Sequence, residues 1–338
     1  PALFWPSVMR ITIRLRPGYP AMSNIRDASP ASRKFYEINL FGRRFAIDTD
    51  RPDVIETFFV SFYGDAHNAM AAPPKNSERN LFRLSVNHSH PGKIKQNSIA
   101  EPIPIPEPGM QLFLEWEPES GEAVFNVPPA PESRVTQIVC AAASNFIYLT
   151  LMSAGVFFFH ASSAARAGGA VMFCGPNGSG KSTVMRAALA QGAKYLSDDA
   201  CATAKNDCGA VCVYPGREAV EIADLSTDEI SLLKKKGFRP SPHEKFLSPP
   251  AAGLLSPIRA VYFLSGMEGI PAVRPLSARA AAVRLMRLHR MPMTERACEE
   301  LMRMSGDIAE QAPAFEFELG ADAESGCRAV MEHVESII

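Results

Sequence analysis

The spacing of apolar and polar residues along the chain changes character near Arg134. Before it, short runs with strand-like alternation are separated by turns rich in Pro, Gly, Asn and Asp, such as residues 101–109. Residues 9–131, counted from the first methionine, are therefore predicted to form a β-rich N-terminal domain, which contains no catalytic motif that we recognise. The runs that predict its strands are residues 10–15, 35–40, 44–47, 57–62, 81–86, 111–116 and 123–127.

From Arg134 onward the apolar segments lengthen, and helical spacing alternates with strand-like runs. Such a mixture favours an α/β fold for a second domain over residues 134–338. The run Lys234-Lys235-Lys236 lies near two prolines and is predicted to belong to a solvated loop. Helices are predicted at residues 136–154, 181–191, 278–289, 294–310 and 322–337. Strands are predicted at residues 156–162, 170–174, 194–197, 210–214, 260–264 and 314–319.

One uncharged segment, residues 138–159, is long enough to cross a bilayer. Polar residues from Ser144 to Ser153 are spread through it, however, and Gly155 divides it. Its first part is rich in helix formers, whereas residues 156–159 are β-branched and aromatic. A buried helix followed by a buried strand accounts for both parts, so we expect no contact with a membrane.

Composition and charge exclude several classes of protein. The 338 residues are 46% hydrophobic, with 35 Lys and Arg against 36 Asp and Glu. This balance lacks the long-range positive field of a general nucleic-acid binder, so nucleic acid is not an expected partner. The seven cysteines are odd in number, and Cys201, Cys208 and Cys212 lack the paired spacing of a zinc site. We therefore expect reduced thiols in a cytoplasmic protein, and the N-terminal arginines, which interrupt any signal-peptide core, agree.

A phosphate-binding loop lies between a predicted strand and a predicted helix. It fits the pattern G-x-x-x-x-G-K-[ST] and consists of Gly175, Pro176, Asn177, Gly178, Ser179, Gly180, Lys181, Ser182 and Thr183. Its glycines let backbone N–H groups turn inward as an anion nest, and the following helix offers its N-terminus to the phosphates. Lys181 would reach the β- and γ-phosphates, and the Ser182 hydroxyl would ligate Mg²⁺. The loop therefore predicts a nucleotide site, with ATP and Mg²⁺ as cofactors.

The loop by itself does not identify a reaction, because the form GPNGSGKST is also typical of ABC transporter ATPases. Residues 264–268 (LSGME) are similar to the signature motif of those ATPases. That signature opens a helix and is followed by an apolar strand ending in Asp-Glu. Here Gly269 and Pro271 prevent a helix, and no such strand follows in the sequence, so an ABC ATPase is not expected.

Asp198 and Asp199 follow the strand that comes after the phosphate-loop helix. A strand–helix–strand crossover brings the second strand back parallel to the first, so the acidic pair is expected at the sheet edge that carries the loop. One carboxylate there can hold Mg²⁺, and the other can accept the proton of an attacking hydroxyl. His160 ends an aromatic run before the loop, and its spacing alone favours a buried core residue.

The order of these features resembles HPr kinase/phosphorylase and its kinase relatives. The similarity comprises His160-Ala-Ser, the phosphate loop, a helix ended by Gly192, and Lys194-Tyr-Leu-Ser-Asp-Asp199. It implies a phosphoenolpyruvate-carboxykinase-like nucleotide-binding core, joined here to a β-rich N-terminal domain, and transfer of phosphate to a serine hydroxyl. It also implies that Asp198 is the general base and that His160 is a neighbouring catalytic or positioning residue.

By the same resemblance, Ser182 and Asp199 would bind the metal together with a later glutamate. Glu221 is the nearest candidate for that glutamate, and Glu218 is the next. The Gly-rich second signature of the family is missing from residues 215–224. The N-terminal region is similar instead to divergent relatives associated with peptide natural-product biosynthesis, including lasso-peptide kinases. In those proteins the acceptor can be a serine of a precursor peptide, which the β-rich domain would recognise or present.

Three functions are therefore compatible with the sequence. The preferred hypothesis is a kinase whose acceptor is a serine of a peptide or protein. The second is a kinase that acts on the hydroxyl of a small molecule. The third is a nucleotide-binding regulatory protein with little transfer activity, which would need neither Asp198 nor His160 at the γ-phosphate. The sequence does not determine the oligomeric state, and a homo-oligomer is compatible with it.

Overall fold

The fold is described from a computed structural model of the chain. Contacts divide the described residues into a first unit that ends at Ala154 and a second that begins at Gly155. This division differs from the boundary predicted near residues 131–134 because the long helix α2 (Glu132–Ser153) belongs with the first unit. The structure describes residues 34–40, 43–49, 81–87, 99–103, 112–117, 122–126, 132–166, 168–198, 200–215, 220–221, 225–240, 246–248, 255–266, 268–289 and 295–337.

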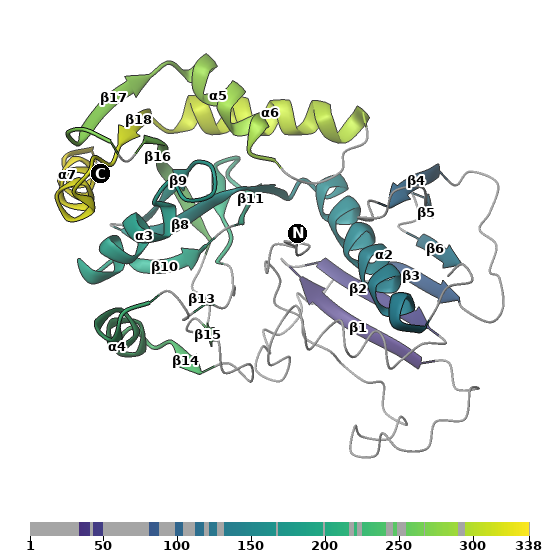
Figure 1. The fold of residues 1–338 in the computed structure, drawn as a ribbon. Coiled ribbons are helices and arrows are strands. Elements are labelled where there is room, and N and C mark those ends of the chain that lie inside the picture. Colours follow the sequence, from purple (N-terminus) through teal and green to yellow (C-terminus); the bar gives the residue numbers. More distant parts are fainter. Residues whose placement is uncertain are drawn as a thin grey trace. The chain divides into compact units, whose positions relative to one another are not determined.

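The described strands of the first unit form a mixed sheet with the order β1-β2-β3-β6-β5-β4 (Figure 1). Neighbouring strands are antiparallel except β2 with β3 and β3 with β6, which are parallel. All but β4 match predicted strands, and the predicted strands 10–15 and 57–62 lie outside the described residues. The strands are β1 (Lys34–Leu40), β2 (Arg43–Thr49), β3 (Leu81–Asn87), β4 (Ile99–Ile103), β5 (Leu112–Glu117) and β6 (Glu122–Asn126).

Strand β4 contradicts the expectation of a turn for residues 101–103, and residues 104–109 of that expected turn lie outside the described residues. Its residues pair with β5, from Ile99 opposite Trp116 onward. β4 stands at the end of the strand order, and an edge strand tolerates Pro102 because the N–H that proline lacks can be one that faces away from the sheet. The proline that argues for a turn therefore marks an edge strand.

Helix α2 packs on this sheet through an apolar core. The inward positions of the strands alternate, as in a sheet with one buried face, and include the fully buried Phe45, Ile47 and Phe125. Phe146 of α2 meets Phe45 edge to face, with ring centroids 6.1 Å apart. None of the described helices, α2 included, combines the length and the apolar character that crossing a bilayer requires. The uncharged segment is the end of α2 followed by strand β7 (Phe157–Phe159), as predicted.

The second unit is built on a curled mixed sheet (Figure 1). Its central strand β16 pairs in parallel with β9 and β18 and antiparallel with β12 at its start. From β9 the sheet continues through β8 to β10, from β12 through β11 to β7, and from β18 to β17. The domain is thus mixed α/β as expected, although the pattern did not predict β11 or β17 and gave residues 156–162 as one strand, which the structure divides at His160 into β7 and β8. The strands other than β7 are β8 (Ala161–Arg166), β9 (Gly169–Cys174), β10 (Lys194–Ser197), β11 (Cys201–Lys205), β12 (Val211–Val213), β16 (Ser256–Gly266), β17 (Ala272–Leu276) and β18 (Ala314–Glu318).

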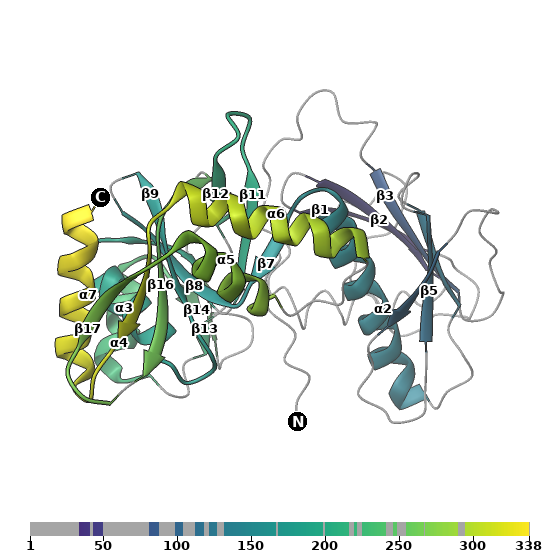
Figure 2. The ribbon, with the colours of Figure 1, turned by 90° about the horizontal axis from the view of Figure 1, so that it is seen from above.

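Helices cover both faces of the sheet in the second unit (Figure 2). α3 (Lys181–Ala190) and α7 (Ala323–Ile337) lie on one face, where Val184 and Val330 share a core with Tyr262. α5 (Ala278–Arg287) and α6 (Glu295–Gln311) pack on each other over the opposite face. There Arg284 lies over the ring of Phe263, which follows Tyr262 in β16 and therefore points the other way.

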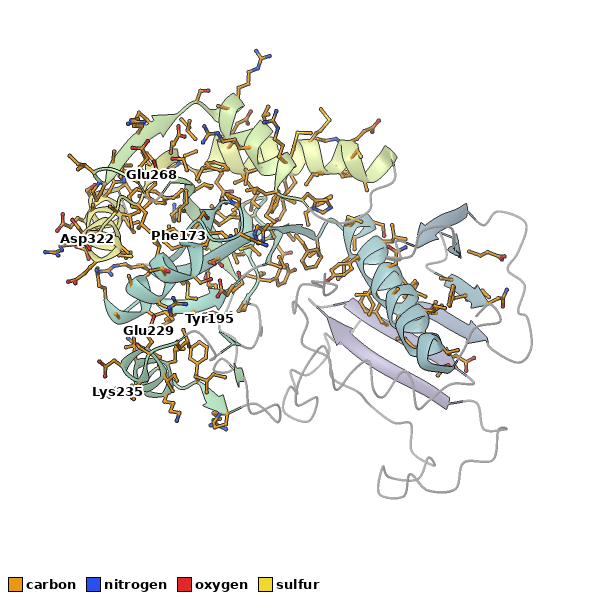
Figure 3. The ribbon with its side chains drawn as sticks, in the orientation of Figure 1. Phe173, Tyr195, Glu229, Lys235, Glu268 and Asp322 are labelled. Atoms are coloured by element: carbon orange, nitrogen blue, oxygen red, sulfur yellow. The ribbon has the colours of Figure 1, made fainter. Side chains whose placement is uncertain are left out.

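The lysine run predicted to lie in a loop closes a helix instead. Lys234 and Lys235 form the last turn of α4 (Thr227–Lys235), and Figure 3 labels Lys235 there. At the start of α4, Ser226 Oγ accepts from the Glu229 N–H at 3.3 Å and Glu229 Oε2 accepts from the Ser226 N–H at 2.9 Å. This reciprocal capping box starts the helix, and the lysines suit the negative end of its dipole. Chain segments on either side of α4 form a small sheet of β13 (Val220–Glu221), β15 (Phe246–Ser248) and β14 (Arg239–Pro240).

Candidate functional site

The phosphate loop connects β9 to α3 at the carboxyl-terminal edge of the parallel strands. Gly178 and Gly180 have φ angles of 76° and 91°, a left-handed conformation that favours glycine. The Ser179 N–H donates to the Pro176 carbonyl at 3.2 Å, and the Val184 N–H donates to the Gly180 carbonyl at 2.9 Å as α3 begins. The first turn of α3 carries no acidic side chain, so the positive end of its dipole can attract an anion.

The loop lies tightly against two neighbouring strands. A β-carbon on Gly175 would be 2.6 Å from Ser179 Oγ and 3.1 Å from the Leu264 carbonyl in β16. One on Gly180 would be 2.7 Å from a methyl group of Leu319, directly after β18. β16 runs parallel to β9, and β18 runs parallel to β16, so the carboxyl ends of all three strands lie at this edge of the sheet. These contacts fix the position of the loop, and with it the direction of its N–H groups.

Lys181, the first residue of α3, is buried, and its ammonium donates to the Pro176 carbonyl at 2.8 Å. The cation is therefore folded back over the loop. Cys174 directly precedes the loop, and burial, with the neighbouring Cys201, raises the pKa of its thiol far above the ordinary value, against the opposing effect of Lys181. Burial thus favours the neutral form of the Cys174 thiol, and Lys181 is the charged side chain at this part of the loop.

Asp198 lies beside the phosphate loop. β9 and β10 are both antiparallel to β8, so they run in the same direction and end at the same edge of the sheet, although β8 lies between them. Ser182 Oγ donates to Asp198 Oδ1 at 2.9 Å. The crossover thus brings the carboxylate to the phosphate-loop hydroxyl, as its topology predicts.

A β-bulge in β10 brings a further residue to Asp198. The ladder between β10 and β8 shifts by one residue before Ser197, which pairs with Ser163. Asp198 is therefore level with Ser162, whose hydroxyl donates to Asp198 Oδ1. Ser162 belongs to the His-Ala-Ser string, but the sequence pattern did not identify it as a site residue. Only the register of the bulged strand reveals it.

His160 separates β7 from β8 and is 4% exposed. Its backbone N–H donates to the Leu288 carbonyl at 3.0 Å. The ring of His289 donates through Nδ1 to the Phe158 carbonyl at 2.8 Å; burial lowers the pKa of His289, against the opposing effect of that bond. The chain at the end of α5 therefore holds the backbone at His160 and two residues before it. The catalytic or positioning role of His160 stays a prediction.

The predicted metal ligands are described only in part. Asp199 and Glu218 lie outside the described residues, and Glu221 is described through its backbone in β13 alone. Within the described part of the chain, no cluster of three or more His, Cys, Asp or Glu side chains could hold a metal ion. The Ser182 hydroxyl nevertheless fits Mg²⁺, which needs only one or two protein oxygens when phosphates and water supply the rest.

Together these residues place a carboxylate beside a glycine-rich loop that carries a buried lysine. The loop N–H groups and Lys181 suit the polyphosphate of a nucleotide, and a carboxylate beside them can accept a proton during phosphoryl transfer.

The sequence matches no model of a known protein family and no curated protein.

Proposed function

We propose that the chain is a nucleotide- and Mg²⁺-dependent kinase that transfers the γ-phosphoryl group of ATP to a hydroxyl, most simply the serine hydroxyl of a peptide or protein. The observation that carries the proposal is the hydrogen bond of 2.9 Å between Ser182 Oγ and Asp198 Oδ1. It brings a carboxylate to the phosphate loop, and a carboxylate beside the γ-phosphate could accept the proton of an acceptor hydroxyl.

The roles of the residues follow from their positions. The loop N–H groups and Lys181 would stabilise the negative charge on the transferred group and on the leaving diphosphate. Mg²⁺, held by Ser182 and a carboxylate, would neutralise charge on the phosphate oxygens when bound. Asp198 would take the proton as the acceptor oxygen bonds to the γ-phosphorus and the bond to the leaving oxygen breaks. His160 would help to position these groups, and Asp199 and Glu221 are proposed as further metal ligands.

The proposal extends to the type of fold and to the compartment. We assign the second unit to a phosphoenolpyruvate-carboxykinase-like core of the kind found in HPr-kinase-like proteins. The sequence β9–loop–α3–β10–Asp198 supports this assignment. The β-rich first unit would recognise the acceptor. A cytoplasmic location agrees with the free thiols of the six cysteines whose side chains the structure describes.

The regulatory alternative uses many of the same groups. A protein that only senses nucleotide would need the phosphate loop and Lys181, and it could use a carboxylate beside the loop hydroxyl for its metal. The bond between Ser182 and Asp198 is therefore compatible with both functions, and phosphoryl transfer separates them. A small-molecule acceptor would use the same groups, so the acceptor itself has to be tested.

The test is a transfer assay with radiolabelled ATP and Mg²⁺. Serine-containing peptides, the same peptides with Ala in place of Ser, and a set of small alcohols are offered as acceptors. Label that enters the serine peptides alone is expected. Label in small alcohols alone would support the second hypothesis. Tight ATP binding with no transfer to either class would contradict the kinase and favour the regulatory protein.

A further inference from the structure

We propose that Ser162 is a positioning residue that orients the carboxylate of Asp198. This role rests on the kinase function proposed above, because it serves the proton transfer in that reaction. Ser162 lies in β8 with no exposed surface, and its hydroxyl donates to Asp198 Oδ1. A hydrogen bond from a buried hydroxyl to a carboxylate is stronger than one between neutral groups. Ser162 is therefore suited to hold Asp198 in one orientation.

Two hydroxyls, those of Ser162 and Ser182, donate to the same oxygen of Asp198, but they belong to elements of different kinds. Ser182 is part of the phosphate loop, whose side chains would have to adjust to a bound nucleotide, including that of Lys181, which now donates to the Pro176 carbonyl. Ser162 belongs to a strand that is paired on both sides, with β9 and with β10. It is thus the donor that keeps its place while the loop adjusts.

A fixed donor on Oδ1 restricts rotation of the Asp198 carboxylate. The direction of its proton-accepting lone pairs is then set before the acceptor arrives, which removes part of the cost of orientation from the reaction. Without Ser162 the carboxylate would lose this fixed donor. We therefore expect the loss of this hydroxyl to slow transfer and to leave nucleotide binding unchanged.

The neighbouring residue provides a matched control. Ser163 is also fully buried in β8, but successive strand residues face opposite sides of the sheet. Its hydroxyl contacts Ser197 Oγ at 2.7 Å and Cys201 Sγ at 3.2 Å. Ser162→Ala and Ser163→Ala therefore remove the same buried group from the same strand, and only the first of them touches Asp198.

The kinetic test compares kcat, KM for ATP and Tm in these two variants and in Ser162→Thr, which keeps a hydroxyl. Ser162→Ala is expected to lower kcat by about 10- to 100-fold, the size expected for one hydrogen bond to a charged group. Its KM for ATP and its Tm should stay close to those of Ser163→Ala, and Ser162→Thr should recover most of the rate. In an Asp198→Asn background, Ser162→Ala should add no further loss. Equal kcat in the two alanine variants, or a full additional loss in that background, would overturn the proposal.

A structural readout separates this proposal from the proposed function. Crystal structures of the wild type and of Ser162→Ala are compared, each with a non-hydrolysable ATP analogue and Mg²⁺. The Asp198 carboxylate should keep one orientation in the wild type and should rotate or occupy several positions in the variant. If the wild type transfers phosphate to no acceptor, the kinase function fails, and the two structures still decide the role of Ser162. An unchanged carboxylate in Ser162→Ala would overturn that role whatever the activity.

Discussion

The hydroxyl of Ser182 and the carboxylate of Asp198 are in direct contact, 2.9 Å apart, although 16 positions separate the two residues in the chain. Ser182 lies in the first turn of α3, and Asp198 directly follows β10. The contact joins the group proposed to ligate Mg²⁺ to the group proposed to accept a proton. Nucleotide binding and activation of the acceptor are therefore expected to meet at one point, and the two can be separated by mutation.

Asp198→Asn should abolish most of the transfer and preserve nucleotide binding. Asparagine keeps the shape of the side chain and can still accept a hydrogen bond from Ser182, but it cannot take a proton. We expect kcat to fall by about 10²- to 10⁴-fold, the usual contribution of a general base. ATP affinity, measured by calorimetry, should change little. Asp307→Asn, at the surface pair with Lys205, is the control, and wild-type transfer by Asp198→Asn would refute the assignment of the base.

Lys181→Met should weaken ATP binding by at least about tenfold, because a charge-assisted contact to phosphate is lost. The side chain is 6% exposed, so an unbranched apolar replacement should be accommodated and Tm should be nearly unchanged. Lys194→Met is the control, since Lys194 is an exposed residue at the start of β10. ATP affinity can be measured by calorimetry for both variants. Equal affinity in both would show that Lys181 does not contact the nucleotide.

Two glycines in helices should respond to alanine in opposite ways. A β-carbon on Gly326 in α7 would lie 2.0 Å from the Leu319 carbonyl oxygen, so Gly326→Ala should lower the free energy of unfolding by about 1–3 kcal/mol or more. A β-carbon on Gly306 in α6 would meet only open space. Gly306→Ala should therefore raise the free energy of unfolding by about 0.5–1 kcal/mol. Urea unfolding measures both. A stable Gly326→Ala variant would mean that α7 can move away from the residues that hold the phosphate loop.

Glu229 should make the stability of α4 depend on pH. The Ser226 backbone N–H, with smaller help from Arg186, holds the pKa of Glu229 below its ordinary value of 4.5, against the opposing effect of burial. Because the pKa is lowered in the folded state, the stabilisation is fully present above pH 4.5 and is lost as the pH falls through the folded pKa. Glu229→Gln keeps the capping box and removes the charge. Its free energy of unfolding should be lower than that of the wild type by about 0.5 kcal/mol at pH 7, with a slightly lower Tm, and the two should converge as the pH falls below the folded pKa.

The control for this prediction is Glu310→Gln, at an exposed position in α6. Its Tm difference from the wild type should show no comparable dependence on pH. A difference for Glu229→Gln that stays constant from pH 7 to pH 3 would mean that the carboxylate does not support the start of α4. Figure 3 labels Glu229 on this helix.

The sequence predicts an element well where one local pattern determines it. The strand Lys194–Ser197 has the predicted bounds, because an apolar run there is enclosed by Gly192 and by the acidic pair. α4 was not predicted, because the lysines and prolines after it outweighed the capping signal of Ser226 and Glu229. When one local pattern favours a helix and its neighbour favours a loop, only the tertiary contacts show which of the two structures forms.

The candidate site, too, could be predicted only in part from the sequence. The handedness of a crossover is general, so the proximity of Asp198 to the phosphate loop could be inferred from the sequence. The insertion of β8 between β9 and β10, and the bulge before Ser197, depend on pairings between distant segments. No pattern of residues along one strand contains this information. Ser162 therefore became visible only through the structure.

The short hairpin between β8 and β9 has a consequence for how this protein can vary. Arg166 pairs with Gly169, so two residues connect the strands, and one of them is Gly168 with a φ of 81°. Because neighbouring residues of a strand face opposite sides, a slip of one residue would turn Ser162 away from Asp198 and Ala164 out of the core. An insertion or deletion at this turn that shifted the register would thus lower the proposed activity with every catalytic residue still present. The length of a surface loop is therefore under the same constraint as the active site.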